Sequence, residues 1–288
     1  LKAMRAHQWV KNILIFVPLL MSYQVLNPTL TARALGAFIA FSLMASGTYL
    51  FNDLMDLEAD RAHPTKRHRP FASGALSIRW GQVLIPMLVA AGLIIGWFLS
   101  TPFLVVLIGY TVITLTYTLL LKRLVLVDVL VLAGLYTWRI FAGAIATDVA
   151  LSAWLLAFSM FMFFSLALLK RTSELLEMRA AGKLKASGRG YHVDDLSQLT
   201  IFGSTSGYIS ALVLALYINS ESVRALYHRP ETLWLICPLI LYWVSRVWLI
   251  GHRGLMHSDP IVFALKDRAS YAVGLIVLGL LWIGHQGW

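Results

Sequence analysis

The feature that most constrains this chain is a series of long, continuous apolar runs separated by short charged, proline-containing or glycine-containing breaks. A helix of about 20 apolar residues crosses the hydrocarbon core of a bilayer, where only helices and closed barrels satisfy their backbone groups. Because the apolarity is continuous rather than alternating, the runs predict helices. We therefore expect an all-α, polytopic membrane protein with about nine transmembrane helices. The expected spans are Val10–Leu26, Arg33–Phe51, Trp80–Leu99, Phe103–Leu121, Leu124–Thr147, Leu151–Leu169, Leu199–Asn219, Thr232–Ile250 and Ser270–Gly284.

The composition agrees with this reading and excludes a water-soluble enzyme. Of the 288 residues, 59% are hydrophobic and 13% are charged, with a mean hydropathy of +0.73, whereas about a quarter of a soluble domain is charged. The spans leave only short loops, so we expect one transmembrane domain over residues 1–288. The single cysteine, Cys237, excludes an internal disulfide. The first residue is Leu1 rather than methionine, as in a processed or excised piece of a longer chain.

The charges are distributed unevenly between the two ends of the spans. The 24 Lys and Arg residues exceed the 14 Asp and Glu residues, and most of the basic ones lie at the N-terminus or after every second span. The positive-inside rule therefore predicts a cytoplasmic N-terminus and cytoplasmic polar loops. Most acids lie on the same side, which suggests a polar cytoplasmic cap that contains an active site. Anionic substrates fit this basic excess better than nucleic acid, which is not an expected partner.

The densest group of polar residues directly follows the second span, in the segment from Asn52 to Asp60. At 100° per residue, Asp53, Asp56 and Asp60 fall within an arc of about 60°, while Glu58 points elsewhere. Carboxylates so close repel one another unless a cation joins them. Sparse, hard oxygen ligands suit Mg²⁺, which takes its other ligands from water and substrate phosphates. We expect these three aspartates to be catalytic Mg²⁺ ligands.

A basic loop with Lys66, Arg67 and Arg69 comes next in the chain. Arginine binds phosphate through paired N–H groups and lysine binds it as a point charge. Together with Mg²⁺ on the aspartates, these cations would form a receptor for a diphosphate. Positive-inside anchoring is the competing explanation for their charge.

Several other polar residues are candidates for phosphate binding. Arg139 lies inside the fifth span, 11 residues after Asp128, so it must face the protein interior, where it either meets a substrate phosphate or makes a structural contact. Lys11 opens the first span as a phosphate donor or as a membrane anchor. Lys170 and Glu174 form an i,i+4 pair after the sixth span, either as a surface pair or as part of a phosphate site.

The pattern NDxxDxxxD at Asn52–Asp60 resembles the first aspartate-rich motif of the UbiA superfamily of intramembrane prenyltransferases. Three segments resemble the decaprenyl-phosphate phosphoribosyltransferase branch more closely: Gln8–Asn12, Asn52–Pro70, and Lys170-Arg171 with Glu174. This resemblance implies a nine-helix transferase that moves phosphoribose from phosphoribosyl pyrophosphate to a polyprenyl phosphate and releases pyrophosphate. It also implies that Mg²⁺ is the cofactor and that Asn52 belongs to the substrate-binding site.

Two motifs depart from the superfamily pattern. The usual second motif, DxxxD after the sixth span, is replaced by Lys170-Arg171 and Glu174, with Tyr191 as a further candidate substrate-binding residue. The YxxxK motif after the fourth span is approximated by Tyr117 and Lys122, one residue too far apart, and Lys122 is the candidate phosphate ligand. These departures put a second Mg²⁺ site in doubt.

Two alternative functions stay open at this stage. The first is an aromatic prenyltransferase that ionises a prenyl diphosphate at the same aspartate site, although the missing second DxxxD motif counts against it. The second is a transporter for an anionic lipid or metabolite. The chain lacks the paired, Gly- or Pro-broken spans that mark many transporters, and clustered aspartates fit metal chemistry better.

Overall fold

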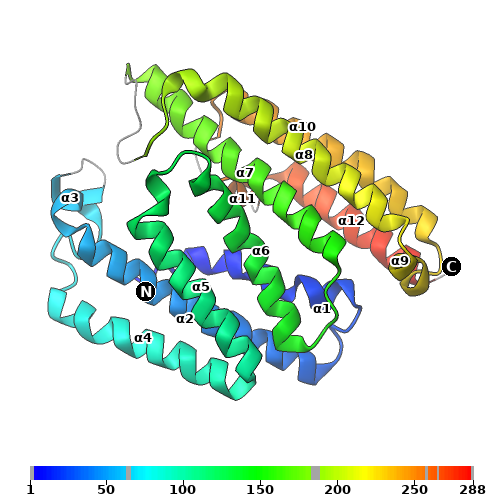
Figure 1. Cartoon of the computed structure of the whole chain (residues 1–288), viewed down its shortest axis with the longest axis horizontal. Coiled ribbons are helices and arrows are strands. Elements are labelled where there is room, and N and C mark those ends of the chain that lie inside the picture. The colour runs from blue at the N-terminus through cyan, green and yellow to red at the C-terminus, as the bar shows by residue number, and fades with distance from the viewer. Residues whose placement is uncertain (1–2, 63–65, 183–188, 257–258, 265, 287–288) are drawn as a thin grey trace. The chain divides into compact units, whose positions relative to one another are not determined.

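The computed structural model describes residues 3–62, 66–182, 189–256, 259–264 and 266–286. All regular elements in these ranges are helices (Figure 1), which confirms the all-α prediction. The chain separates into two compact units: unit 1 comprises Leu1–Leu120 and Trp138–Leu151, and unit 2 comprises Leu121–Thr137 and Ser152–Trp288. Helix α6 (Val127–Thr147) contributes its first part to unit 2 and its last part to unit 1.

Eight helical segments in the described ranges are long and apolar enough to cross a membrane, and they correspond to the last eight expected spans. The chain is therefore an integral membrane protein. These segments are α2 (Pro28–Met55), α4 (Ile78–Leu99), α5 (Thr101–Leu119), α6, α7 (Ala153–Ala180), α8 (Leu196–Ile218) with the preceding η4 (Val193–Asp195), η5 (Pro230–Leu235) with α10 (Ile236–His252), and α12 (Arg268–Gln286). The shorter elements between them are α3 (Leu57–Ala62), η2 (Lys66–His68), η3 (Leu121–Arg123), α9 (Glu221–Leu226) and α11 (Pro260–Ala264).

The first expected span differs from the prediction. Instead of one long α-helix, the structure has the 3₁₀ helix η1 (Ala6–Phe16) followed by the short α1 (Val17–Met21). Pro18 is the second residue of α1 and has no N–H to donate to the preceding turn. The backbone of η1 also lies directly against α6, because a Cβ added at Gly143 would be 2.0 Å from the Ile15 carbonyl oxygen. Apolarity alone could not reveal this change of helix type.

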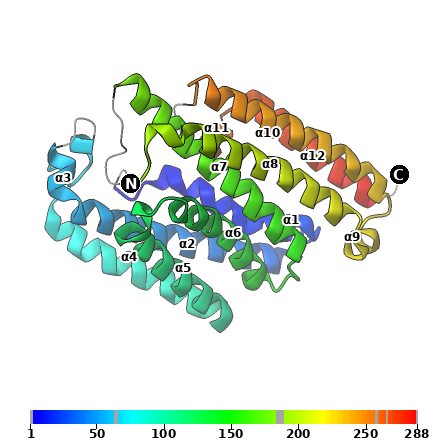
Figure 2. The same ribbon diagram turned by 45° about the horizontal axis from the view of Figure 1, so that its top comes forward.

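In unit 1, α2 and α4 run side by side in both views (Figures 1 and 2). Asn27 caps the start of α2, where its side-chain oxygen accepts the N–H of Thr29 at 3.1 Å. A Cβ added at Gly92 of α4 would lie 3.2 Å from the Ala40 carbonyl oxygen of α2. Small residues thus allow the two backbones to approach closely, as is usual for helices in membranes.

In unit 2, α7 and α8 form a close pair, and α10 packs against α8 (Figures 1 and 2). A Cβ added at Gly203 of α8 would lie 2.2 Å from the Trp248 ring of α10. The indole N–H of Trp248 donates to the Ser165 hydroxyl of α7 at 3.0 Å. Close packing and interhelical hydrogen bonds therefore join these three helices.

Two helices continue well beyond their expected apolar spans. Helix α2 extends to Met55 and so includes Asn52 and Asp53, while α7 extends to Ala180 and includes Lys170 and Glu174. A helix keeps its hydrogen-bond ladder after the residues stop being apolar. The first polar groups of both candidate clusters therefore lie on rigid helices rather than in loops.

Candidate active site

In unit 1, the carboxylates of Asp53 and Asp60 converge on one arginine. Arg69 Nη1 lies 3.1 Å from Asp53 Oδ1 and 2.7 Å from Asp60 Oδ2. Arg5 Nη2 lies 2.5 Å from the same Asp53 oxygen, and its guanidinium stands 5.1 Å above the Tyr49 ring centre. Both carboxylates are about 3% exposed, whereas both arginines are 27% exposed. Buried carboxylates need such nearby positive charge.

The other residues of the aspartate motif are more accessible. Asp56 is half-buried and caps the end of α2, and its carbonyl oxygen accepts the Asp60 N–H at 2.8 Å, which links α2 to α3. Glu58 is exposed, in agreement with its different direction on the helix. Lys66 and Arg67 are exposed on η2. Positions 63–65 of the recognised Asn52–Pro70 run lie outside the described residues.

Asn52 supplies an observation that bears on metal binding. Its amide nitrogen donates to the Thr118 hydroxyl at 3.3 Å, but its buried Oδ1 has no hydrogen-bond partner among the described residues. This amide oxygen belongs to the residue that precedes Asp53 in sequence, and it fits the hard donor set that Mg²⁺ prefers. In the described part of the chain, no three Asp, Glu, His or Cys side chains are already gathered around a common point. Arginines lie against the carboxylates instead.

Arg139 belongs to a second polar group of unit 1. Its Nε donates to Asn12 Oδ1 at 2.8 Å, and its Nη2 donates to the Tyr110 hydroxyl at 2.6 Å. Asn12 in turn donates to Ser42 at 3.0 Å. Arg139 therefore faces the protein interior, as expected, and links η1, α2, α5 and α6. Lys11, which precedes Asn12 in the sequence, is half-buried.

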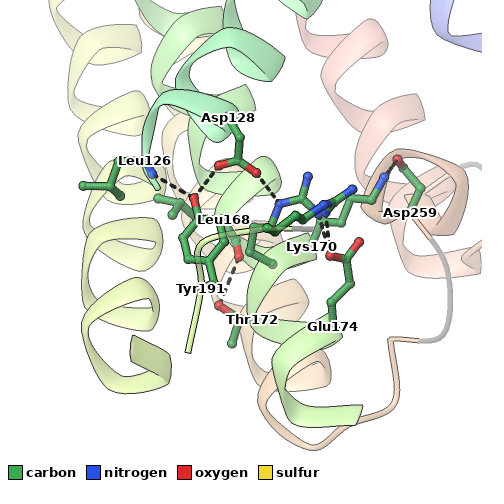
Figure 3. Close-up of polar contacts among 10 residues, drawn as sticks. Leu126, Asp128, Leu168, Lys170, Thr172, Glu174, Tyr191 and Asp259 are labelled. Atoms are coloured by element: carbon green, nitrogen blue, oxygen red, sulfur yellow. Dashed lines mark hydrogen bonds and ion pairs between the residues drawn. The ribbon is translucent and has the colours of Figure 1, made fainter. Parts of the chain in front are cut away.

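Unit 2 contains a basic cluster at the end of α7 (Figure 3). Arg171 is 2% exposed, and its Nε donates to Asp128 Oδ2 at 2.7 Å, while its Nη1 donates to Glu174 Oε2 at 2.5 Å. Arg189, from the segment between α7 and α8, reaches the same Glu174 oxygen at 2.7 Å. Two guanidinium groups thus share one carboxylate that is 40% exposed.

Lys170 and Tyr191 lie on either side of this group. The Lys170 ammonium is 3.0 Å from Asp259 Oδ2 and is 33% exposed; Asp259, rather than the expected i,i+4 neighbour Glu174, is its described ion-pair partner. The Tyr191 hydroxyl donates to Asp128 and accepts the Leu126 N–H at 2.9 Å (Figure 3). Tyr191 is 1% exposed. Burial and the hydrogen bond to Asp128 raise the pKa of this hydroxyl, so it stays a proton donor.

The remaining candidates have separate surroundings. Lys122 is half-buried on η3 of unit 2. Arg246 lies near the end of α10 and makes a two-point ion pair with Asp267, with N–O distances of 2.7 and 2.9 Å. Asp195 closes a capping box with His192 at the start of η4, since its carboxylate accepts the His192 N–H at 2.8 Å. Asp195 therefore has a structural role.

Sequence reasoning missed three members of these clusters as site residues: Arg5, Asp128 and Arg189. Arg5 lies 48 positions from its partner Asp53. Asp128 contacts Arg171, which is 43 positions away in the sequence. A buried acid at the start of an apolar helix was the available signal for Asp128. Nothing local distinguishes Arg189 from other loop cations.

The chain is similar to known sequences along nearly its whole length. It is 39% identical to an uncharacterized protein, y4nM, of Sinorhizobium fredii over 96% of this chain and 54% of that protein. It is 36% identical to the nodulation protein NoeC of Azorhizobium caulinodans, over 98% of this chain and 92% of NoeC. It is 30% identical to the decaprenyl-phosphate phosphoribosyltransferase of Mycolicibacterium smegmatis, over 100% of this chain and 91% of that enzyme.

The fold is also similar to that of solved structures. A UbiA homolog from Archaeoglobus fulgidus, solved with DMAPP and Mg²⁺, superposes with a TM-score of 0.72 over 99% of this chain and 98% of that chain, at 14% sequence identity. The sequence profile of the UbiA prenyltransferase family matches residues 13–285, and the resemblance inferred from the motifs is confirmed. The chain belongs to the UbiA prenyltransferase family, whose members are intramembrane transferases.

Proposed function

We propose that this protein transfers phosphoribose from phosphoribosyl pyrophosphate to a polyprenyl phosphate, with Mg²⁺ as cofactor and pyrophosphate as the leaving product. Similarity to the Mycolicibacterium smegmatis enzyme along the whole chain supports this choice of reaction. The family match runs through both units, so we treat residues 1–288 as one transferase domain. We further propose that the N-terminus and the polar loops face the cytoplasm, where a soluble sugar donor would be available.

The observation that carries the proposal is the basic cluster of unit 2. Arg171 and Arg189 meet at Glu174, and Lys170 is the neighbouring residue on α7. Prenyltransferases of the superfamily have an aspartate-rich motif here, which suits a second Mg²⁺ and a diphosphate. Guanidinium and ammonium groups suit a phosphate directly, and a carboxylate can accept a ribose hydroxyl. This chemistry favours a sugar phosphate over a prenyl chain.

From the residues of unit 1 alone, we propose that its aspartate cluster binds Mg²⁺ and a pyrophosphate group. Asp53, Asp56 and Asp60, with the amide oxygen of Asn52, would hold Mg²⁺. The bound ion would neutralise charge that develops on the departing pyrophosphate. Lys66, Arg67 and Arg69 would bind the same group through charge-assisted hydrogen bonds.

The transfer step needs little acid or base chemistry from the protein. An oxygen of the polyprenyl phosphate forms a bond to the anomeric carbon of ribose, and the bond from that carbon to the pyrophosphate oxygen breaks with its electron pair. The attacking phosphate is already anionic, so it needs no strong general base. Lys11, Lys122 and Arg139 are candidates to offset the repulsion between the two anionic substrates and to orient the acceptor.

The test uses the full chain purified in detergent or nanodiscs. Radiolabelled phosphoribosyl pyrophosphate with a polyprenyl phosphate should give a labelled lipid and an equal amount of pyrophosphate, only when both substrates and Mg²⁺ are present. A parallel reaction contains a prenyl diphosphate and an aromatic acid. Consumption of the prenyl diphosphate without use of phosphoribosyl pyrophosphate would overturn the proposed donor and favour an aromatic prenyltransferase.

A further inference from the structure

In unit 1, the segment that leads into η1 is held against α2 by one buried hydroxyl. Ser46 donates to the Met4 carbonyl oxygen at 2.9 Å and accepts the Trp9 indole N–H at 2.9 Å. Ser46 itself is 0% exposed. Met4 also packs against a buried apolar cluster that includes Leu50 and Phe71. The chain is therefore fixed to α2 at both Met4 and Trp9.

Arg5 lies between these two anchors and has a backbone conformation that is rare for a residue with a side chain. Its φ of 49° and ψ of 48° are left-handed. This conformation is unfavourable for any residue with a Cβ, and it persists only where the surrounding structure holds it. In this conformation, Nη2 lies 2.5 Å from Asp53 Oδ1 and the guanidinium lies 5.1 Å from the Tyr49 ring centre. The local strain thus accompanies a contact with the aspartate cluster.

The Arg5 guanidinium is accessible and uses only part of its hydrogen-bonding capacity. The side chain is 27% exposed. A guanidinium carries five N–H donors, and the one hydrogen bond that this guanidinium makes within the described part of the chain is the bond from Nη2 to Asp53. Donors therefore remain for an anion that approaches from the exposed side.

The charges around Asp53 determine when such an anion would bind. Arg5 and Arg69 contact the same Asp53 oxygen, Oδ1, at 2.5 and 3.1 Å. A Mg²⁺ ion on this carboxylate would lie beside two guanidiniums, and the like charges would repel one another. An anion that binds the ion and the N–H donors together would remove this repulsion, and Mg²⁺ commonly takes such ligands from phosphates. Mg²⁺ and the anion should therefore strengthen each other's binding.

We propose that Arg5 binds the pyrophosphate group that accompanies Mg²⁺ at the aspartate cluster, and that Ser46 is the positioning residue for Arg5. The assignment of this pyrophosphate to the phosphoribosyl donor rests on the function proposed above. Without pyrophosphate, Arg5 pairs with Asp53. When Mg²⁺ and pyrophosphate bind, the ion takes the carboxylate oxygen, and the Arg5 N–H groups donate to phosphate oxygens. This exchange requires rotation of the Arg5 side chain only.

The first test measures two affinities of the purified full chain in detergent. Mn²⁺, which binds to the same kinds of oxygen ligands as Mg²⁺, is titrated without pyrophosphate and followed by electron paramagnetic resonance. Inorganic pyrophosphate is titrated calorimetrically at saturating Mg²⁺. Arg5→Gln should weaken pyrophosphate binding about 10-fold to 100-fold, the scale of one hydrogen bond to a charged group. The same substitution should tighten Mn²⁺ binding severalfold, because a competing cation is gone.

The opposite signs of these two changes separate ligand binding from structural damage, since a distorted cluster would lose both affinities. Arg79→Gln is the matched control, because it removes the same charge from an exposed position on α4 of the same unit. It should leave both affinities unchanged. Arg5→Lys keeps the charge without the paired N–H groups, so it should retain part of the pyrophosphate affinity. It also keeps the test available if Arg5→Gln does not fold.

A double-mutant cycle tests the positioning role of Ser46. Ser46→Ala removes the hydroxyl that holds Met4 and Trp9, and it should weaken pyrophosphate binding severalfold. In the Arg5→Gln background, the same substitution should change pyrophosphate binding less than twofold, because no guanidinium remains to be positioned. Equal effects of Ser46→Ala in the two backgrounds would contradict the positioning role.

The outcomes for Arg5 and for the proposed function can be told apart. Absence of pyrophosphate binding in the unmodified protein would overturn the inference, as would an unchanged pyrophosphate affinity in folded Arg5→Gln or a parallel loss of Mn²⁺ and pyrophosphate binding. If pyrophosphate binds in an Arg5-dependent manner but phosphoribosyl pyrophosphate is not turned over, the proposed function fails and the role of Arg5 stands. Turnover with an unchanged donor KM in Arg5→Gln would contradict the role of Arg5 alone.

Discussion

The two polar clusters distribute charge between buried and exposed positions in opposite ways. In unit 1, the carboxylates of Asp53 and Asp60 are buried and the arginines that contact them are 27% exposed. In unit 2, Arg171 is buried and anchored by the buried Asp128, while Glu174 is 40% exposed. In the first cluster, therefore, the carboxylates are fixed and the cations that contact them can be replaced. In the second cluster, the Arg171 guanidinium is fixed and the anionic group that contacts it can be replaced.

This difference suggests what each cluster can bind. Half-buried arginine side chains can move aside at moderate cost, so we propose that the aspartates of unit 1 accept another cation, such as Mg²⁺. If the Arg171 side chain moved away, the buried Asp128 carboxylate would lose its cationic partner, which is costly. The unit 2 cluster is therefore suited to present positive charge to an anion. We therefore propose a metal-assisted diphosphate site in unit 1 and a direct phosphate site in unit 2.

The largest expected effect tests the fixed acids of unit 1. Asp53→Asn, Asp56→Asn and Asp60→Asn should each lower turnover more than about a hundredfold, which is the scale of losing one important electrostatic stabiliser. Removal of divalent ions with EDTA should abolish activity, and added Mg²⁺ should restore it. Steady-state turnover of folded protein in detergent is the measurement.

The matched control is Glu58→Gln, because Glu58 lies in the same motif but is exposed. It should retain most of the activity. Equal tolerance of all four substitutions would remove the metal-site reading of this cluster.

The next largest effect tests the basic cluster of unit 2. Lys170→Ala and Glu174→Ala should each raise KM for phosphoribosyl pyrophosphate about 10-fold to 100-fold, since hydrogen bonds to charged groups contribute about 1.5–3 kcal/mol. The Mg²⁺ concentration for half activation should stay the same. Titration of donor at saturating acceptor measures the first quantity, and unaltered donor KM in both variants would reassign this cluster to a purely structural role.

A smaller effect is expected when the half-buried Arg69 of unit 1 and the buried Arg171 of unit 2 are each replaced and the Mg²⁺ requirement is measured. Arg69→Gln removes a guanidinium that contacts both buried carboxylates of unit 1. We expect the Mg²⁺ concentration for half activation to fall severalfold, because one competing cation is gone, and the donor KM to rise. Arg171→Gln should raise donor KM without any change in the Mg²⁺ requirement. If both variants shift the Mg²⁺ requirement alike, the distinction between the clusters is wrong.

Sequence alone predicted the local parts of these clusters and missed the distant ones. Asp53 and Asp60 contact a common partner, Arg69, although α2 ends at Met55 and α3 begins at Leu57, so no single helix carries both aspartates. Apolar runs predicted nine spans, of which the last eight correspond to long apolar helices in the described residues. They ended the sixth span at Leu169, whereas α7 continues to Ala180, because apolarity stops at the membrane surface while the helix continues. The contact of Asp128 with Arg171 joins residues 43 positions apart. Only tertiary packing determines such a pair.

The smallest expected effect concerns the Arg246–Asp267 ion pair, which lies outside both clusters. Burial alone would raise the pKa of Asp267, but hydrogen bonds from Arg246 and Ser270 outweigh burial and lower it. A folded-state pKa below the unfolded value of about 3.9 means that the pair stabilises the folded protein above that pH. This stabilisation is lost as the pH falls through the folded-state pKa.

Arg246→Gln should therefore lower Tm by about 2 °C at pH 7, corresponding to about 1 kcal/mol for a partly exposed pair. The difference from the unmodified protein should shrink steadily as the pH falls below about 4. Arg253→Gln is the matched control, because Arg253 is an exposed arginine directly after α10. A Tm difference for Arg246→Gln that is independent of pH would mean that the arginine stabilises through packing of its aliphatic stem instead of its charge.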